Sequence, residues 1–124
     1  MEIVSFEIAK KLKEKGFPQH ITDEAYIIEN YGEDEYDIGD RLPIPLIPDY
    51  MDDVAAPTIS QVLKWLRESK KMFVQIEING MGYIVSIYRR KYFDSELIYP
   101  LKNKFDTYEH AALAGIEYCL DNLI

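Results

Sequence analysis

Residues 57–87, PTISQVLKWLRESKKMFVQIEINGMGYIVSI, predict one helix that runs directly into one β-hairpin. Thr58 lies three residues before Gln61, which is the spacing of a capping box at a helix start. The next residues place an apolar stripe at helical spacing, with Trp65 beside it. The stripe consists of Ile59, Val62, Leu63 and Leu66. We expect this helix to end between residues 69 and 71.

The hairpin is predicted from a turn signal between two alternating apolar runs. Asn79 and Gly80 form the preferred pair for a type I′ turn, because both positions of that turn need a positive φ. The predicted cross-strand pairs are Ile78 with Met81, Ile76 with Tyr83, Val74 with Val85, and Met72 with Ile87. These eight side chains would share one face, and a slip by one residue would move them off it. We expect Ile76→Asp to unfold the domain, since an unpaired buried carboxylate is costly.

Two further helices are indicated near the ends of the chain. Ser5 can cap the first helix, over residues 5–16, and Gly16 fits a Schellman stop. The last helix has a capping box at Asp106 and Glu109, and its Gly115 suits a close approach to a sheet. The inner side of the first helix is expected to carry Ile8, Ala9 and Leu12, and that of the last helix Tyr108, Ala112, Ile116, Cys119, Leu120 and Leu123.

The remaining segments complete an α+β architecture. Residues 25–29 predict a short strand, and residues 30–40 predict a loop or a long hairpin tip. Residues 42–48 alternate proline with aliphatic residues and should run extended. We expect this segment to wrap the core; the alternative is that it binds an aromatic groove on a partner. Residues 50–56 connect to the central helix, and residues 96–99 predict a third strand that Pro100 stops. We therefore expect a three- to four-stranded antiparallel sheet with the central and C-terminal helices packed on one face.

The length of 124 residues predicts a single domain over residues 1–124. Its parts are the first helix at 5–16, an acidic and proline-rich segment at 19–56, and a helix–hairpin–helix core at 57–124. The chain shows no signal segment and no apolar run long enough to span a bilayer, so a cytoplasmic protein is expected. The single cysteine, Cys119, excludes an internal disulfide and fits a reducing compartment.

Charge is distributed unevenly along the chain. The net charge is −8. Residues 19–57 hold 11 acidic residues and only one basic residue, Arg41, a local net charge of −10. Residues 58–104 hold 9 basic and 4 acidic residues, a local net charge of +5. Such a separation can steer association with a charged partner.

Two groups of candidate binding residues follow from this charge pattern. The acidic and aromatic group is Glu33, Asp34, Glu35, Tyr36 and Asp37, and the basic and aromatic group is Arg89, Arg90 and Tyr92. Cations interleaved with aromatic rings can bind a nucleic acid, but an edge strand protected by its charges explains the second group more economically. An EF-hand is excluded in the acidic group, because setting Gly39 at the sixth loop position places Tyr36 and Ile38 where oxygen ligands belong.

No catalytic residue, metal ligand or cofactor site is predicted. Nucleophilic catalysis needs a base beside the nucleophile, and His20 and His110 have no evident partner. No phosphate-binding glycine loop, zinc-protease motif or His/Cys ligand spacing is present in the sequence. An enzymatic role is therefore disfavoured.

Three stretches carry a resemblance to a protein family. Residues 56–68 (APTISQVLKWLRE), Gly82-Tyr83 and residues 105–117 (FDTYEHAALAGIE) resemble a family of small uncharacterised α+β proteins of gut anaerobic bacteria, often encoded in prophages and mobile elements. This resemblance implies no activity. The hairpin followed by a helix beginning Thr107-x-Glu109-x-Ala111 is also similar to HicB-like antitoxins, although the glycine-rich strand of that family is missing.

These observations lead to one expected function and one alternative. The first is a small, non-enzymatic accessory or regulatory protein, encoded on a mobile element, that acts by binding another protein. The alternative is a nucleic-acid-associated role, either as an acidic DNA mimic or as a HicB-like antitoxin module. A membrane partner is not expected.

Overall fold

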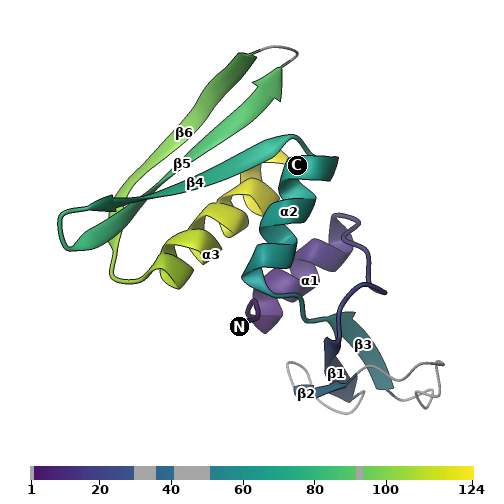
Figure 1. Cartoon of the computed structure of the whole chain (residues 1–124). Coiled ribbons are helices and arrows are strands. Elements are labelled where there is room, and N and C mark those ends of the chain that lie inside the picture. Colours follow the sequence, from purple (N-terminus) through teal and green to yellow (C-terminus); the bar gives the residue numbers. More distant parts are fainter. Residues whose placement is uncertain (1, 30–35, 41–50, 92–93) are drawn as a thin grey trace. The chain divides into compact units, whose positions relative to one another are not determined.

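The computed structural model describes residues 2–29, 36–40, 51–91 and 94–124, and it divides into two compact units (Figure 1). The first unit contains Ile3–Thr58, and the second contains Glu2 and Ile59–Ile124. Helices and antiparallel sheets are present, so the predicted α+β class is confirmed. The assignment of the chain to a single domain stays a prediction.

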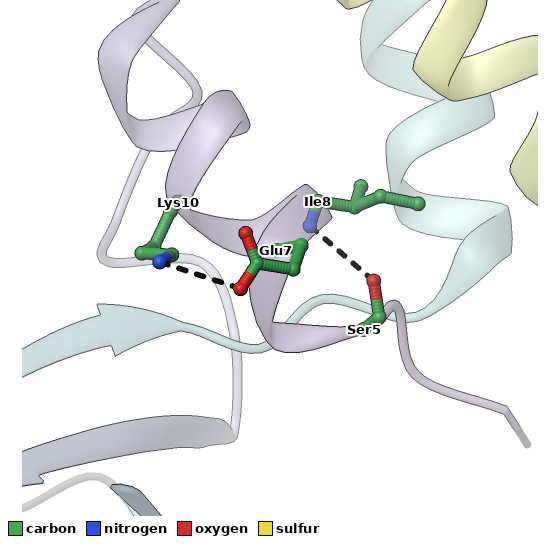
Figure 2. Close-up of polar contacts among 4 residues, drawn as sticks. All are labelled: Ser5, Glu7, Ile8 and Lys10. Atoms are coloured by element: carbon green, nitrogen blue, oxygen red, sulfur yellow. Dashed lines mark hydrogen bonds and ion pairs between the residues drawn. The ribbon is translucent and has the colours of Figure 1, made fainter. Parts of the chain in front are cut away.

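The first unit begins with helix α1 (Phe6–Glu14), whose start matches the predicted cap. The Ser5 hydroxyl accepts a hydrogen bond from the Ile8 backbone N–H at 3.3 Å (Figure 2). This bond satisfies one of the N–H groups that the first helical turn leaves without a partner. Lys10 Nζ lies 3.4 Å from Glu7 Oε1, one turn away on the exposed side of the helix (Figure 2).

Helix α1 ends in the predicted Schellman motif. Gly16 adopts a left-handed φ of 91°, which glycine reaches without a Cβ penalty. The Phe17 N–H donates to the Leu12 carbonyl at 2.9 Å, and the Gly16 N–H donates to the Lys13 carbonyl at 3.2 Å. These two bonds define the motif, so the prediction is confirmed.

A three-stranded antiparallel sheet in the order β2-β1-β3 completes the first unit. Its strands are β1 (Glu24–Glu29), β2 (Tyr36–Asp40) and β3 (Met51–Ala55). The strand predicted at residues 25–29 is confirmed. The assignment of residues 50–56 to a connection is wrong, because 51–55 pair with β1. Asp52 and Asp53 interrupt the apolar alternation that would indicate a strand in the sequence, so β3 is recognised only from its main-chain pairing with β1. Residues 30–35 and 41–50, and with them the whole of the extended segment predicted at residues 42–48, lie outside the described residues.

Tyr26 on β1 ties the sheet of the first unit to the chain before α1. Its ring meets the Phe6 ring edge-on at 5.3 Å, and its hydroxyl donates to the Val4 carbonyl at 2.6 Å. Tyr26, Phe6 and Val4 are all buried. The tyrosine hydroxyl therefore has a hydrogen-bond partner in a place from which water is excluded. The side-chain amide of Gln19 adds a second tie, because its oxygen accepts from the Ala55 N–H at 2.8 Å.

The second unit packs two helices against a sheet of order β4-β5-β6 (Figure 1). Its elements are α2 (Ile59–Ser69), β4 (Met72–Asn79), β5 (Gly82–Lys91), β6 (Asp94–Phe105), α3 (Tyr108–Tyr118) and the π-helical turn η1 (Cys119–Leu123). Helix α3 contacts all three strands, and α2 contacts β4 and α3. The predicted placement of both helices on the hairpin sheet is thereby confirmed.

The helices of the second unit follow the predicted stripes closely. The stripe of α2, with Trp65, is buried as predicted. On α3 the predicted cap is displaced by one residue, because Thr107 rather than Asp106 accepts the His110 N–H, at 3.1 Å. Tyr108 was predicted to lie inward, but its side chain is 45% exposed. The tyrosine is the first residue of the helix, and its ring meets the Tyr83 ring edge-on, with the ring centroids 6.4 Å apart.

The hairpin register differs from the prediction by two residues. Asn79 is paired with Gly82, so Gly80 and Met81 form the turn. Gly80 has a φ of 66°, and Met81 does not have a positive φ, a combination that suits a type II′ turn with glycine first. A slip by two residues keeps the side chains that remain in the two strands on their faces, so the hydrophobic pattern could not detect it. Met81 leaves the apolar face and is fully exposed at the tip.

Strand β6 extends far beyond the predicted residues 96–99. It continues past Pro100, which is paired with Ser86, and ends at Phe105. The sheet order makes β6 an edge strand, where the missing proline N–H can face away from the ladder. The expectation that Pro100 stops the strand is therefore wrong.

Candidate functional site

The structure describes only some of the predicted binding residues. Glu33, Asp34, Glu35 and Tyr92 lie outside the described residues. Tyr36 and Asp37 belong to β2, where they are the Cα partners of Ile28 and Ile27. Arg89 and Arg90 belong to the last part of β5. The candidate site that the structure defines is therefore built around the two arginines.

Three further cations come from the end of α2 and the residues after it. We name the resulting set the basic end, which consists of Arg67, Lys70, Lys71, Arg89 and Arg90. The Arg90 N–H donates to the Lys71 carbonyl at 3.0 Å, so the end of β5 lies beside the chain that leaves α2. Lys71 has a φ of 58°, and this left-handed residue turns the chain directly from α2 into β4.

The local geometry keeps these cations at the surface. Lys71 Nζ donates to the Glu68 carbonyl at 3.2 Å, where a cation suits the negative end of the helix dipole. Lys70 Nζ lies 5.4 Å from the centre of the Trp65 ring, a cation–π contact. Arg89 is half-buried, and the other members of the basic end are exposed. Among the described side chains, none forms an ion pair with any of the five.

The interpretation of Arg89 and Arg90 as protection of an edge strand is wrong. Strand β5 lies between β4 and β6, so it is the central strand of its sheet. The register error also concealed the basic end, because the predicted pairing would place Lys71 opposite Tyr88 rather than Arg90. The sequence does contain a sign of the basic end: a second cationic run, Lys70-Lys71, directly precedes the first strand of the hairpin whose second strand ends with Arg89 and Arg90.

Cys119 lies in the core of the second unit, as predicted. Its side chain is fully buried, and burial raises the pKa of the thiol from 9.0 to about 12. A thiol that stays protonated is a poor nucleophile. Among the described residues, no group of three or more His, Cys, Asp or Glu side chains is placed to hold a metal ion.

The raised pKa of Cys119 makes stability depend on pH in the alkaline range. The folded thiol stays neutral up to about pH 12, whereas the unfolded thiol ionises above 9.0. The contribution of this thiol to the free energy of unfolding is therefore fully present below pH 9. Above pH 9 it falls by at most about 1.4 kcal/mol per pH unit. We expect urea unfolding to show that wild type exceeds Cys119→Ala in stability at pH 7, and that this difference narrows above pH 9. A constant difference up to pH 10.5 would contradict the prediction.

No helix in the described part of the chain is long and apolar enough to cross a membrane. Comparison of the chain with protein-family models, with curated proteins and with solved structures finds no match.

Proposed function

We propose that this chain is a small accessory or regulatory protein that acts by binding an acidic surface of another protein through its basic end. The proposal includes a cytoplasmic location, a gene on a mobile element and no catalysis by the chain itself. The observation that carries it is that two cationic runs, Lys70-Lys71 after α2 and Arg89-Arg90 at the end of β5, meet at one end of the hairpin, and that none of these side chains forms an ion pair with a described side chain.

Charge complementarity explains why such a surface serves recognition. Complementary charges speed encounter and suppress wrong partners, and arginine is enriched where planar contacts to carboxylates are made. A local cluster of this size matches a patch of carboxylates. An extended polyanion fits less well, because the net charge of −8 repels it outside the cluster. The acidic and aromatic group remains a proposed second contact, suited to a basic partner; it consists of Glu33, Asp34, Glu35, Tyr36 and Asp37.

Affinity capture from the native host with charge-matched variants tests this function. The test variant is Arg67→Gln/Arg89→Gln/Arg90→Gln, and the control is Lys10→Gln/Lys13→Gln/Lys15→Gln, which removes three cations from α1. We expect one protein to be retained by wild type and by the control, and to bind the test variant about tenfold more weakly, since each charge contact contributes about 0.2–1 kcal/mol. The interaction should also weaken at high salt.

Two outcomes would overturn the proposal in different ways. If nuclease treatment released the captured material, the alternative role in association with nucleic acid, as an antitoxin-like module or a DNA mimic, would replace it. If the test variant retained the partner as well as wild type does, the basic end would not be the binding surface.

A further inference from the structure

The β4-β5-β6 sheet has one face on which neither helix of the second unit packs. Helix α3 lies on the other face, where Val74 and Val85 are the side chains that Gly115 approaches. Helix α2 contacts both β4 and α3, so it lies on that same side. Because side chains alternate along a strand, the odd-numbered residues of β4 and the even-numbered residues of β5 point to the opposite side, which we name the outer face.

Three apolar side chains form a row across the outer face. Phe73 of β4 is paired with Tyr88 of β5, and Tyr88 is paired with Leu97 of β6. Directly opposed residues on adjacent strands have Cβ atoms about 4.5–5.5 Å apart, so the three side chains are contiguous. Leu97 is 50% exposed, and Phe73 and Tyr88 are half-buried. A contiguous apolar patch at the surface, rimmed by polar residues, is typical of an interaction site.

Charge differs between the two sides of this row. Arg90 follows Tyr88 by two residues on β5, so it points to the outer face about 7 Å further along the strand, and its side chain is exposed. On the opposite side of the row, the Gln75 side-chain nitrogen donates to a Glu77 carboxylate oxygen at 2.9 Å. The outer face therefore begins at the basic end, continues through the apolar row, and ends at a carboxylate that already has a hydrogen-bond partner.

We propose that the outer face binds a single segment of the partner protein in which aliphatic side chains adjoin carboxylates. The aliphatic side chains cover the apolar row, and the carboxylates meet Arg90 and the neighbouring cations of the basic end. Glu77 sets the direction of the segment, because it repels a carboxylate placed on its side of the row. The inference rests on the proposed function and specifies the chemistry of the partner at that same site.

A single-stranded nucleic acid suits this face less well than an acidic and aliphatic segment. Bases bind by stacking on exposed aromatic rings, and the rings of Phe73 and Tyr88 are both half-buried. The third member of the row, Leu97, is the most exposed of the three and is aliphatic. The net charge of −8 also repels a polyanion that extends beyond the basic end.

Selection from a library of random peptides displayed on phage, with the full chain as bait, tests the inference. We expect the enriched peptides to combine Asp or Glu with Leu, Ile, Val or Met. The most strongly enriched peptide is then synthesised for isothermal titration calorimetry. It should bind Tyr88→Thr and Leu97→Thr at least about fivefold more weakly than wild type, since each variant loses apolar area that binding removes from water. Arg90→Gln should weaken binding at low salt more than at high salt.

Met81→Thr is the matched control for Leu97→Thr. Met81 is a fully exposed apolar side chain at the hairpin tip, outside the row, so its loss should leave the affinity for the peptide unchanged. Threonine keeps a β-branched side chain in the strands, and thermal melting checks that each variant is folded.

The outcomes separate this inference from the proposed function. Enriched peptides that are acidic without aliphatic residues, and that bind Leu97→Thr as well as wild type, would overturn the inference and leave the basic end as the binding surface. Peptides that lack carboxylates and are indifferent to Arg90→Gln would contradict both. The inference also fails if no peptide is enriched over a Leu97→Asp bait. Displacement of the peptide by a single-stranded oligonucleotide, or self-association that Leu97→Thr abolishes, would assign the row to a nucleic acid or to a second copy instead.

Discussion

Ile87→Asp is expected to unfold the second unit. Ile87 lies on the central strand β5, and its side chain is fully buried. An unpaired carboxylate at this place loses its hydration and gains no partner, and the cost of several kcal/mol compares with a total stability of about 5–15 kcal/mol. Circular dichroism and thermal melting should show loss of the cooperative transition at neutral pH.

Leu97→Asp provides the matched control for Ile87→Asp. Leu97 belongs to the same sheet, but its side chain is 50% exposed, so the same carboxylate would stay hydrated. We expect this variant to remain folded with a small change in melting temperature. If Ile87→Asp melted like the control, the β5 face would not be the core of the unit. Ile76→Asp should have an effect between the two, because Ile76 is half-buried and not fully enclosed as the sequence predicted.

Gly115→Ala is expected to lower the free energy of unfolding by about 1–3 kcal/mol, the usual cost of overpacking a core. A Cβ at position 115 would lie 2.5 Å from Val74 Cγ1 and 3.0 Å from Val85 Cγ1. Helix propensity alone predicts the opposite sign, because alanine in a helix interior is favoured over glycine by roughly 0.5–1 kcal/mol. The sign of the change in the free energy of unfolding, measured by urea unfolding, therefore shows whether packing or helix propensity dominates.

A double-mutant cycle with Val74→Ala makes the Gly115 prediction specific. Removing the Val74 methyl groups should leave room for the new Cβ. The cost of Gly115→Ala should then be smaller in the Val74→Ala background, with a coupling of about 0.5–3 kcal/mol. If the two effects were additive, the close approach of α3 to β4 would not be the cause.

Local signals predicted the helices well because their causes lie within a few residues. The Ser5 cap needs only the N–H three residues ahead, and the Gly16 stop needs only carbonyls of the preceding turn. The stripe of α2 likewise depends on a period of 3.6 residues that the sequence displays directly. The cap of α3 was misplaced by one residue because Asp106 and Thr107 are both good capping residues.

The sheets were less predictable because strand register and strand order depend on residues that are far apart in the sequence. A period of two is unchanged by a slip of two residues, so the register depended on the turn, where Gly80-Met81 competed with Asn79-Gly80. Strand β3 carries two aspartates and shows no apolar alternation. Whether Pro100 ends a strand or lies within one depends on the strand order, which follows only from the assembled fold.

The sequence predicted two of the five residues of the basic end, Arg89 and Arg90, but not their position beside Lys71. Arg89 and Arg90 stand out as a run of cations in the sequence. Their juxtaposition with Lys71 depends on the hairpin register and on the left-handed turn after α2. A cluster assembled from two strand ends therefore becomes visible only once the pairing is known.

Pro100 protects the outer border of the β4-β5-β6 sheet against growth by strand addition. The sheet order places β6 at this border, and a proline there cannot donate to a further ladder. Extension of the sheet into a fibril, the hazard of an open β edge, is thereby opposed on the β6 side.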